Sequence, residues 1–177
     1  MMAEYNHETE NLANRLSVDE AGEVIKSIMT GDIDYQKNVL KNDFLTNMNM
    51  AQFNPERRLC GVGISTCCMV ANGNVYPCPG WQEMVLGNLN EIPLQEIWDN
   101  GEKIKWLRSL KMKDLGGGEC CKCDKAAFCA PCMVRNANES PTGNPLEINR
   151  HFCAVAAKNK QIVLDWRKAK LKELGHK

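Results

Sequence analysis

Cysteine is the residue type in this sequence best suited to chemistry, and ten of the 177 residues are cysteines. One group lies between residues 60 and 78, and a second has the spacing Cys-x2-Cys-x5-Cys-x2-Cys between residues 120 and 132. Residues 1–10 are polar and acidic and no apolar signal-peptide segment follows them, so we expect a cytoplasmic chain. In a reducing compartment this density of cysteine indicates bound metal rather than disulfides. The ten are Cys60, Cys67, Cys68, Cys78, Cys120, Cys121, Cys123, Cys129, Cys132 and Cys153.

The number of cysteines leaves the identity of the metal open. Four thiolates that converge on one small volume hold a [4Fe–4S] cluster. Four thiolates also hold a tetrahedral zinc ion. Eight suitably placed cysteines are therefore enough for two clusters or for two zinc sites.

A hairpin inside the first group bears on which cysteines are ligands. The dipeptide Asn72-Gly73 predicts a two-residue turn, because both of its residues tolerate positive φ. Counting back from such a turn places Cys67 opposite Cys78 on one face of the ribbon. A three-residue turn would reverse this assignment, since a slip of one residue moves every side chain to the other face. The two-residue turn predicts Cys67 as a ligand and leaves Cys68 as a spare thiol.

The elements that position these cysteines follow from hydrophobic periodicity and capping signals. The pattern predicts an α+β fold, in which a small β-hairpin, helices and a Cys-rich loop surround two metal clusters after a helical N-terminal segment. Residues 62–71 and 75–78 are expected to be strands. Gly116-Gly117-Gly118 is expected to end regular structure, and 136–145 to be a loop. Arg135, Asn136 and Asn138, after the cysteine loop, are expected to cap a loop; the alternative is contact with a peptide substrate. Helices are expected over 17–31, about 35–47, from Pro93, around 104–110, and over 150–174.

Composition excludes some classes of protein. The formal net charge is zero and the isoelectric point is near 6.8, which argues against a nucleic-acid-binding protein. Eight acidic side chains among residues 1–34 and seven basic ones among residues 158–177 are interpreted as solvated faces. No apolar run approaches the roughly 20 residues that cross a bilayer, so we expect no membrane partner.

Residues 59–153 resemble the SPASM domain, the C-terminal auxiliary-cluster domain of many radical S-adenosylmethionine enzymes. The family pattern begins with a cysteine, nine to fifteen residues, a glycine, four residues and a cysteine, which Cys60, Gly73 and Cys78 match. It continues as Cys-x2-Cys-x5-Cys-x3-Cys and, after a gap, a last cysteine. The segment Leu86-Gly87-Asn88-Leu89 between the two groups also fits. One departure is that two residues, not three, separate Cys129 from Cys132.

The resemblance implies two auxiliary [4Fe–4S] clusters and a role in electron transfer and substrate positioning in an enzyme that modifies peptides or proteins. It divides the chain into a helical segment, residues 1–55, that is a possible remnant of the radical enzyme's barrel, and an auxiliary-cluster domain, residues 56–177. It implies that Cys60, Cys67, Cys78 and Cys132 hold the first cluster, and that Cys120, Cys123, Cys129 and Cys153 hold the second.

The catalytic Cys-x3-Cys-x2-Cys motif of radical S-adenosylmethionine enzymes does not occur in these 177 residues. We therefore expect no catalytic residue here and a radical core protein or domain as the partner. Two alternatives remain. The same cysteines could make a zinc-binding interaction module, or the chain could be a truncated product without a function of its own.

Overall fold

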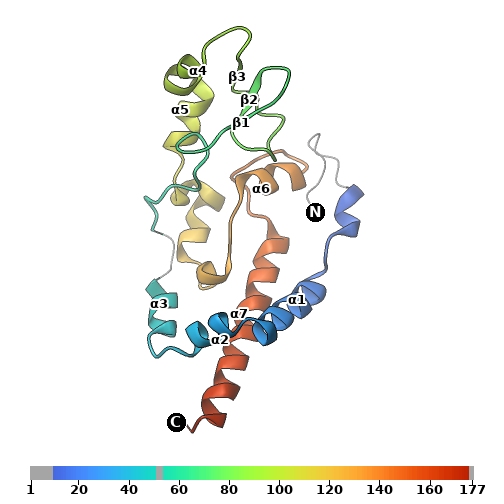
Figure 1. Ribbon diagram of the computed structural model, residues 1–177, viewed down its shortest axis with the longest axis vertical. Helices are drawn as coiled ribbons and strands as arrows, with labels where there is room; N and C mark the ends of the chain where they lie inside the picture. The colour runs from blue at the N-terminus through green and yellow to red at the C-terminus, as the bar shows by residue number, and fades with distance from the viewer. Residues whose placement is uncertain (1–9, 51–53, 176–177) are drawn as a thin grey trace.

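The computed structural model describes residues 10–50 and 54–175, and its elements confirm the α+β class. Figure 1 shows an elongated molecule, in which the sheet lies near one end with α4 and α5, and α7 runs along the axis to the C-terminus. The helices are α1 (Val18–Gly31), α2 (Ile33–Leu40), α3 (Phe44–Met50), α4 (Leu94–Asn100), α5 (Glu102–Ser109), α6 (Met133–Glu139) and α7 (Arg150–Glu173), with 3₁₀ helices η1 (Glu10–Asn14), η2 (Met112–Lys122) and η3 (Ala126–Phe128). The strands are β1 (Cys68–Met69), β2 (Asn74–Tyr76) and β3 (Gly87–Asn88).

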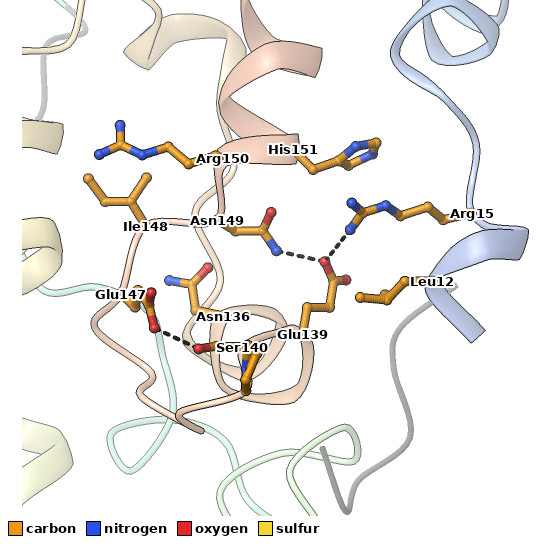
Figure 2. Close-up of a pocket in the computed structure, with 11 residues that line it drawn as sticks. Leu12, Arg15, Asn136, Glu139, Ser140, Glu147, Ile148, Asn149, Arg150 and His151 are labelled. Atoms are coloured by element: carbon orange, nitrogen blue, oxygen red, sulfur yellow. Dashed lines mark hydrogen bonds and ion pairs between the residues drawn. The ribbon is translucent and has the colours of Figure 1, made fainter. Parts of the chain in front are cut away.

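The first helix begins at a capping box. The Ser17 hydroxyl accepts a hydrogen bond from the Glu20 N–H at 3.2 Å, and the Glu20 carboxylate accepts one from the Ser17 N–H at 2.8 Å. The single helix predicted over 35–47 is wrong, since α2 ends at Leu40 and α3 begins at Phe44. Before α1, Arg15 forms an ion pair of 3.1 Å with Glu139 at the end of α6, which ties the N-terminal segment to the later half of the chain (Figure 2).

The N-terminal helices pack on α7. Met29 of α1, Val39 of α2 and Val163 of α7 are buried together in one apolar cluster. The guanidinium of Arg167, itself buried, donates a hydrogen bond to the Val39 carbonyl at 2.5 Å. Figure 1 shows α1 and α2 crossing α7. The helical segment is thereby joined to the helix that carries Cys153.

The sheet of the described chain has the antiparallel order β1-β2-β3. Cys68 pairs with Tyr76, and Asn74 pairs with Asn88. Both predicted strands are shorter than expected, and β3 was not expected as a strand. Val75, in the central strand, is fully buried against Ile97 of α4 and Ile104 of α5. The two helices that position this sheet therefore follow it in the sequence.

The hairpin turn differs from the two-residue turn that the sequence predicts. Val70 donates its N–H to the Asn74 carbonyl at 3.1 Å, and Gly73 donates to the Val70 carbonyl at 2.9 Å. Three residues, 71–73, therefore form the loop, and Gly73 takes a φ of 88°. This geometry is the three-residue hairpin loop that ends on a left-handed glycine. The predicted register is wrong by one residue, and the alternation of faces along the strand is reversed.

Replacing Gly73 with alanine is expected to destabilise the protein by about 1–2 kcal/mol or more. Its φ is left-handed, and a Cβ would lie 2.5 Å from the Asn90 amide nitrogen and 2.6 Å from the Asn88 amide oxygen. Denaturant unfolding would measure the change. Gly31→Ala is the control, because no atom lies within 4 Å of its Cβ position and the residue is helical. An equal effect of both substitutions would contradict this account of the turn.

The three glycines 116–118 all have positive φ, at 57°, 61° and 86°. They reverse the chain inside η2, just before the second cysteine group. A Cβ on Gly116 would lie 2.2 Å from the Ile148 side chain, and the Gly116 N–H donates to the Leu146 carbonyl at 2.8 Å. Only glycine permits this close approach, which brings residues 146–148, and with them the start of α7, against the cysteine loop.

Candidate metal centre

Four cysteines from three places in the chain lie together at the start of α7. Burial, followed by the charge of Cys153, Cys129 and Cys123, raises the pKa of Cys120 to about 11. Burial and the thiols of Cys153 and Cys123 likewise raise the pKa of Cys129. Thiols influence one another in this way only at short range. Cys120, Cys129 and Cys153 also line one cavity of about 30 Å³, which Cys132 borders as well.

Short turns and a helix cap aim these four side chains. The Cys123 N–H donates to the Cys120 carbonyl at 3.3 Å, which closes the Cys-x2-Cys turn. Cys129 follows η3 and donates its N–H to the Ala126 carbonyl at 3.2 Å. Cys153 occupies the first turn of α7, which the Asn149 side chain caps. A capped helix end therefore positions the thiol most distant in sequence.

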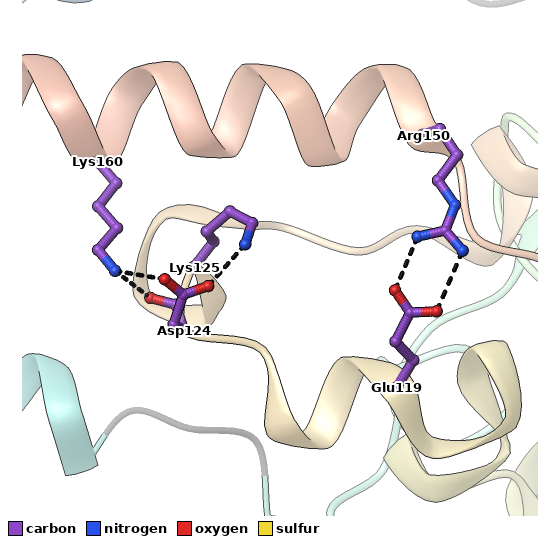
Figure 3. Close-up of polar contacts among 5 residues, drawn as sticks. All are labelled: Glu119, Asp124, Lys125, Arg150 and Lys160. Atoms are coloured by element: carbon purple, nitrogen blue, oxygen red, sulfur yellow. Dashed lines mark hydrogen bonds and ion pairs between the residues drawn. The ribbon is translucent and has the colours of Figure 1, made fainter.

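Two ion pairs hold the cysteine loop on α7 (Figure 3). Arg150 binds both carboxylate oxygens of Glu119, at 2.7 and 3.1 Å. Lys160 donates to the Asp124 carboxylate at 2.7 Å, and hydrogen bonds from Lys125 and Lys160 lower the pKa of Asp124 to about 2. These contacts could not be predicted from the sequence, because the partners are 31 and 36 residues apart and leave no local pattern.

A second group contains Cys60, Cys78 and Cys132. Burial raises the pKa of Cys60 and of Cys78, and the charge of Cys132 adds to both effects. Val62 donates its backbone N–H to the Cys60 sulfur at 3.5 Å, and a backbone hydrogen bond from Gly80 lowers the pKa of Cys78. Such N–H donors to sulfur suit thiolates bound to iron. Three of the four residues predicted for the first cluster are therefore together.

The fourth predicted residue, Cys67, packs with Val75, Ile97 and Ile104. Because Cys68 pairs with Tyr76, the observed register places Cys68, not Cys67, on the face that leads to Cys78. The turn on which the choice of Cys67 depended is thus absent, and the register favours Cys68.

Substituting each of these two cysteines by alanine tests the choice. Cys68→Ala is expected to remove about four iron atoms per chain, the content of one cluster. Cys67→Ala is expected to retain them and to reduce only the free energy of unfolding, because that side chain packs in an apolar cluster. Iron assay after anaerobic reconstitution distinguishes the two. Loss of iron in Cys67→Ala alone would restore the original assignment.

Of the three residues expected to cap a loop, Arg135 donates to a carbonyl of the cysteine loop, whereas Asn136 and Asn138 donate to carbonyls outside it. Arg135 donates to the Ala130 carbonyl at 2.6 Å and lies 3.9 Å from the centre of the Phe152 ring. Asn136 donates to the Pro145 carbonyl, and Asn138 to the Gly80 carbonyl. The prediction of a loop over 136–145 is wrong at its start, since α6 extends to Glu139.

The donor set fits an iron–sulfur cluster. Within residues 10–50 and 54–175, no three His, Cys, Asp or Glu side chains are grouped as the ligands of a single metal ion are. Each thiolate of a [4Fe–4S] cluster binds a different iron at a corner of the cube, so its sulfurs stand farther apart than those around one ion. The thiols of the two groups are partly buried except for Cys60, which is exposed, and amide N–H groups lie beside two of the sulfurs.

Comparison with known proteins shows which class of metal-binding domain these residues resemble. Residues 60–133 match the family model of an iron–sulfur cluster-binding domain. The family is named SPASM, and the match confirms, over these residues, the resemblance seen in the sequence. No solved structure matches the chain.

Similar proteins include two named AdoMet-dependent heme synthase. The one from Methanosarcina barkeri is 34% identical over 88 residues, which are 50% of this chain and 24% of that protein. The one from Nitratidesulfovibrio vulgaris is 31% identical over 83 residues, which are 47% of this chain and 22% of that protein. The similarity thus spans about a quarter of these relatives. No described helix has the length and apolar character needed to cross a bilayer.

Proposed function

We propose that this chain holds two auxiliary [4Fe–4S] clusters and serves a radical S-adenosylmethionine enzyme. The gathering of the thiols into two separate groups carries the proposal. Cys60, Cys78 and Cys132, with one residue of the pair Cys67–Cys68, would hold the first cluster. Four further cysteines would hold the second: Cys120, Cys123, Cys129 and Cys153.

The clusters, when bound, supply one-electron transfer. All ligands in this assignment are cysteines, so no iron has a coordination position left for substrate. The chain's own residues bury the thiolates, direct N–H groups at the sulfurs of Cys60 and Cys78, and hold the loop on α7. These roles suit an electron-transfer and positioning module in a reducing cytoplasm.

The radical reaction itself belongs to a partner in this proposal. The relatives' name, AdoMet-dependent heme synthase, supports a radical core that supplies the missing Cys-x3-Cys-x2-Cys motif. The core would be another chain or a further part of the same protein, with residues 1–55 at the junction. The peptide or protein substrate predicted from the sequence has no support in these heme synthases, so the proposal extends to the clusters and not to a substrate.

Analysis of iron, sulfide and zinc after anaerobic purification and reconstitution tests the proposal. About eight irons and eight sulfides per chain, with a broad brown absorbance, are expected for two clusters. About four of each would reduce the proposal to one cluster. About two zinc ions without sulfide would overturn it in favour of a zinc-binding module.

A further inference from the structure

A cavity of about 230 Å³ lies between η1 and the loop that joins α6 to α7 (Figure 2). No cysteine lines it, so it is separate from both groups of thiols. Its wall mixes polar and apolar side chains and contains charged groups of both signs, among them Arg15 and Glu139, beside the imidazole of His151.

Glu139 is the unusual residue in this wall. Its side chain is only 1% exposed. One carboxylate oxygen, Oε2, accepts hydrogen bonds from Arg15 at 3.1 Å and from Asn149 at 2.6 Å. The other, Oε1, is buried and has no hydrogen-bond partner within the described part of the chain. A buried carboxylate oxygen without a donor is costly, and a ligand that brings a donor would remove that cost.

The other acidic group of the cavity does not share this property. The Glu147 carboxylate accepts hydrogen bonds from the hydroxyls of Ser140 at 2.6 Å and Thr142 at 2.7 Å. Leu12 lies beside the Glu139 carboxylate in Figure 2. It belongs to η1, none of whose five residues is buried, so a ligand that reaches the buried Oε1 would have to displace only a surface side chain.

We propose that this cavity binds the amino group of a free α-amino acid or of a peptide amino terminus. The ammonium donates to Glu139 Oε1, and the neighbouring carboxylate or carbonyl accepts from Arg15, whose side chain is 28% exposed, and from His151. Glu139 and Arg15 already balance one another in charge. A free amino acid, which carries both an ammonium and a carboxylate, therefore enters without leaving an unpaired charge in the site, whereas a peptide terminus adds one positive charge that only the Glu139 carboxylate faces.

The site adjoins the second group of cysteines. Asn136, Ile148 and Asn149 line both this cavity and the cavity lined by Cys120, Cys129, Cys132 and Cys153. A bound amino group would therefore lie one layer of side chains from those thiols. The inference concerns ligand binding alone and does not require that clusters are present.

Isothermal titration calorimetry of the full chain tests the inference, with alanine, leucine, alanyl-alanine and their N-acetylated forms as ligands. Saturable binding of one molecule per chain is expected, with loss of binding on acetylation. Binding of alanine and leucine would indicate that the natural ligand is a free amino acid. Binding of alanyl-alanine alone would indicate a peptide amino terminus. No saturable heat from any of them up to about 10 mM would overturn the inference, as would equal binding of the acetylated forms.

Variants localise the binding. Glu139→Gln is expected to weaken it by about tenfold or more, because it removes the charged acceptor. Arg15→Gln, at a partly exposed position, should weaken it as well and covers the case in which the first variant fails to fold. Glu173→Gln, which removes one exposed carboxylate at the end of α7, is the matched control. Undiminished binding in folded Glu139→Gln or in Arg15→Gln would contradict the site. Iron content, measured on the same samples, reports separately on the clusters.

Discussion

Replacing Cys129 with alanine is expected to remove about four of eight iron atoms, and replacing Cys132 with alanine should remove the other four. The two residues are three positions apart, yet their thiols interact with different partners. Cys129 is near Cys153 and Cys123, whereas Cys132 is near Cys60 and Cys78. Iron and sulfide assays on reconstituted protein measure both losses.

Double variants separate this interleaved arrangement from one in which the loop serves a single cluster. Cys129→Ala with Cys153→Ala should still retain about four irons, because both residues belong to one group. Cys129→Ala with Cys132→Ala should lose nearly all iron. Cys121→Ala is the control, since this thiol packs with Met112, Leu115 and Ala126. If the Cys129/Cys132 double variant retained about four irons, the two residues would share a cluster and the assignment would be wrong.

Removal of iron is expected to unfold one part of the chain and spare another. Between residues 60 and 149 the sheet has only short strands, and the apolar clusters there include Cys78, Cys120 and Cys132. The cluster formed by α1, α2 and α7 contains no cysteine among its residues. Because metal binding to thiolates contributes folding free energy, hydrogen exchange of chelator-treated protein should lose protection over residues 60–149 and keep it in α1, α2 and the second half of α7.

Arg167→Met provides the reciprocal variant. It removes the buried hydrogen bond to the Val39 carbonyl, a loss of about 1.5–3 kcal/mol for a charged donor. Protection should fall in α1 and α2, while the iron content stays unchanged. If chelation removed protection equally from every helix, the clusters and the helical segment would form a single cooperative unit, contrary to this expectation.

Local signals in the sequence predicted the elements that local interactions determine. Ser17 and Glu20 specified the start of α1, Pro93 precedes α4 as expected, and the long periodic segment predicted over 150–174 is α7. The family of residues 60–133 also followed from cysteine spacing. These features depend on neighbours a few positions apart, which a sequence displays directly.

The errors arose where distant contacts decide the local structure. Asn72-Gly73 suits a two-residue turn, but the Asn88 and Asn90 amides donate to the Asn72 carbonyl, at 3.1 and 3.0 Å, from beyond the hairpin. The loop in the structure is one residue longer than predicted. This shift reverses the faces of the strand, so the argument that Cys67 faces Cys78 no longer holds. The ion pair of Arg15 with Glu139 joins residues 124 positions apart and was equally invisible.

The interleaving of the thiols has a consequence for biosynthesis. Translation proceeds from the amino end, so all members of the first group exist once Cys132 has been added, whereas the second group lacks Cys153 until the start of α7 is made. At about 5–20 residues per second, the ribosome takes roughly 1–4 s to cover residues 132 to 153. During that interval Cys120, Cys123 and Cys129 have no fourth partner, whereas all cysteines of the first group have already been made. If the two proposed clusters form, iron–sulfur delivery after release of the finished chain would avoid pairing those three thiols with the wrong cluster.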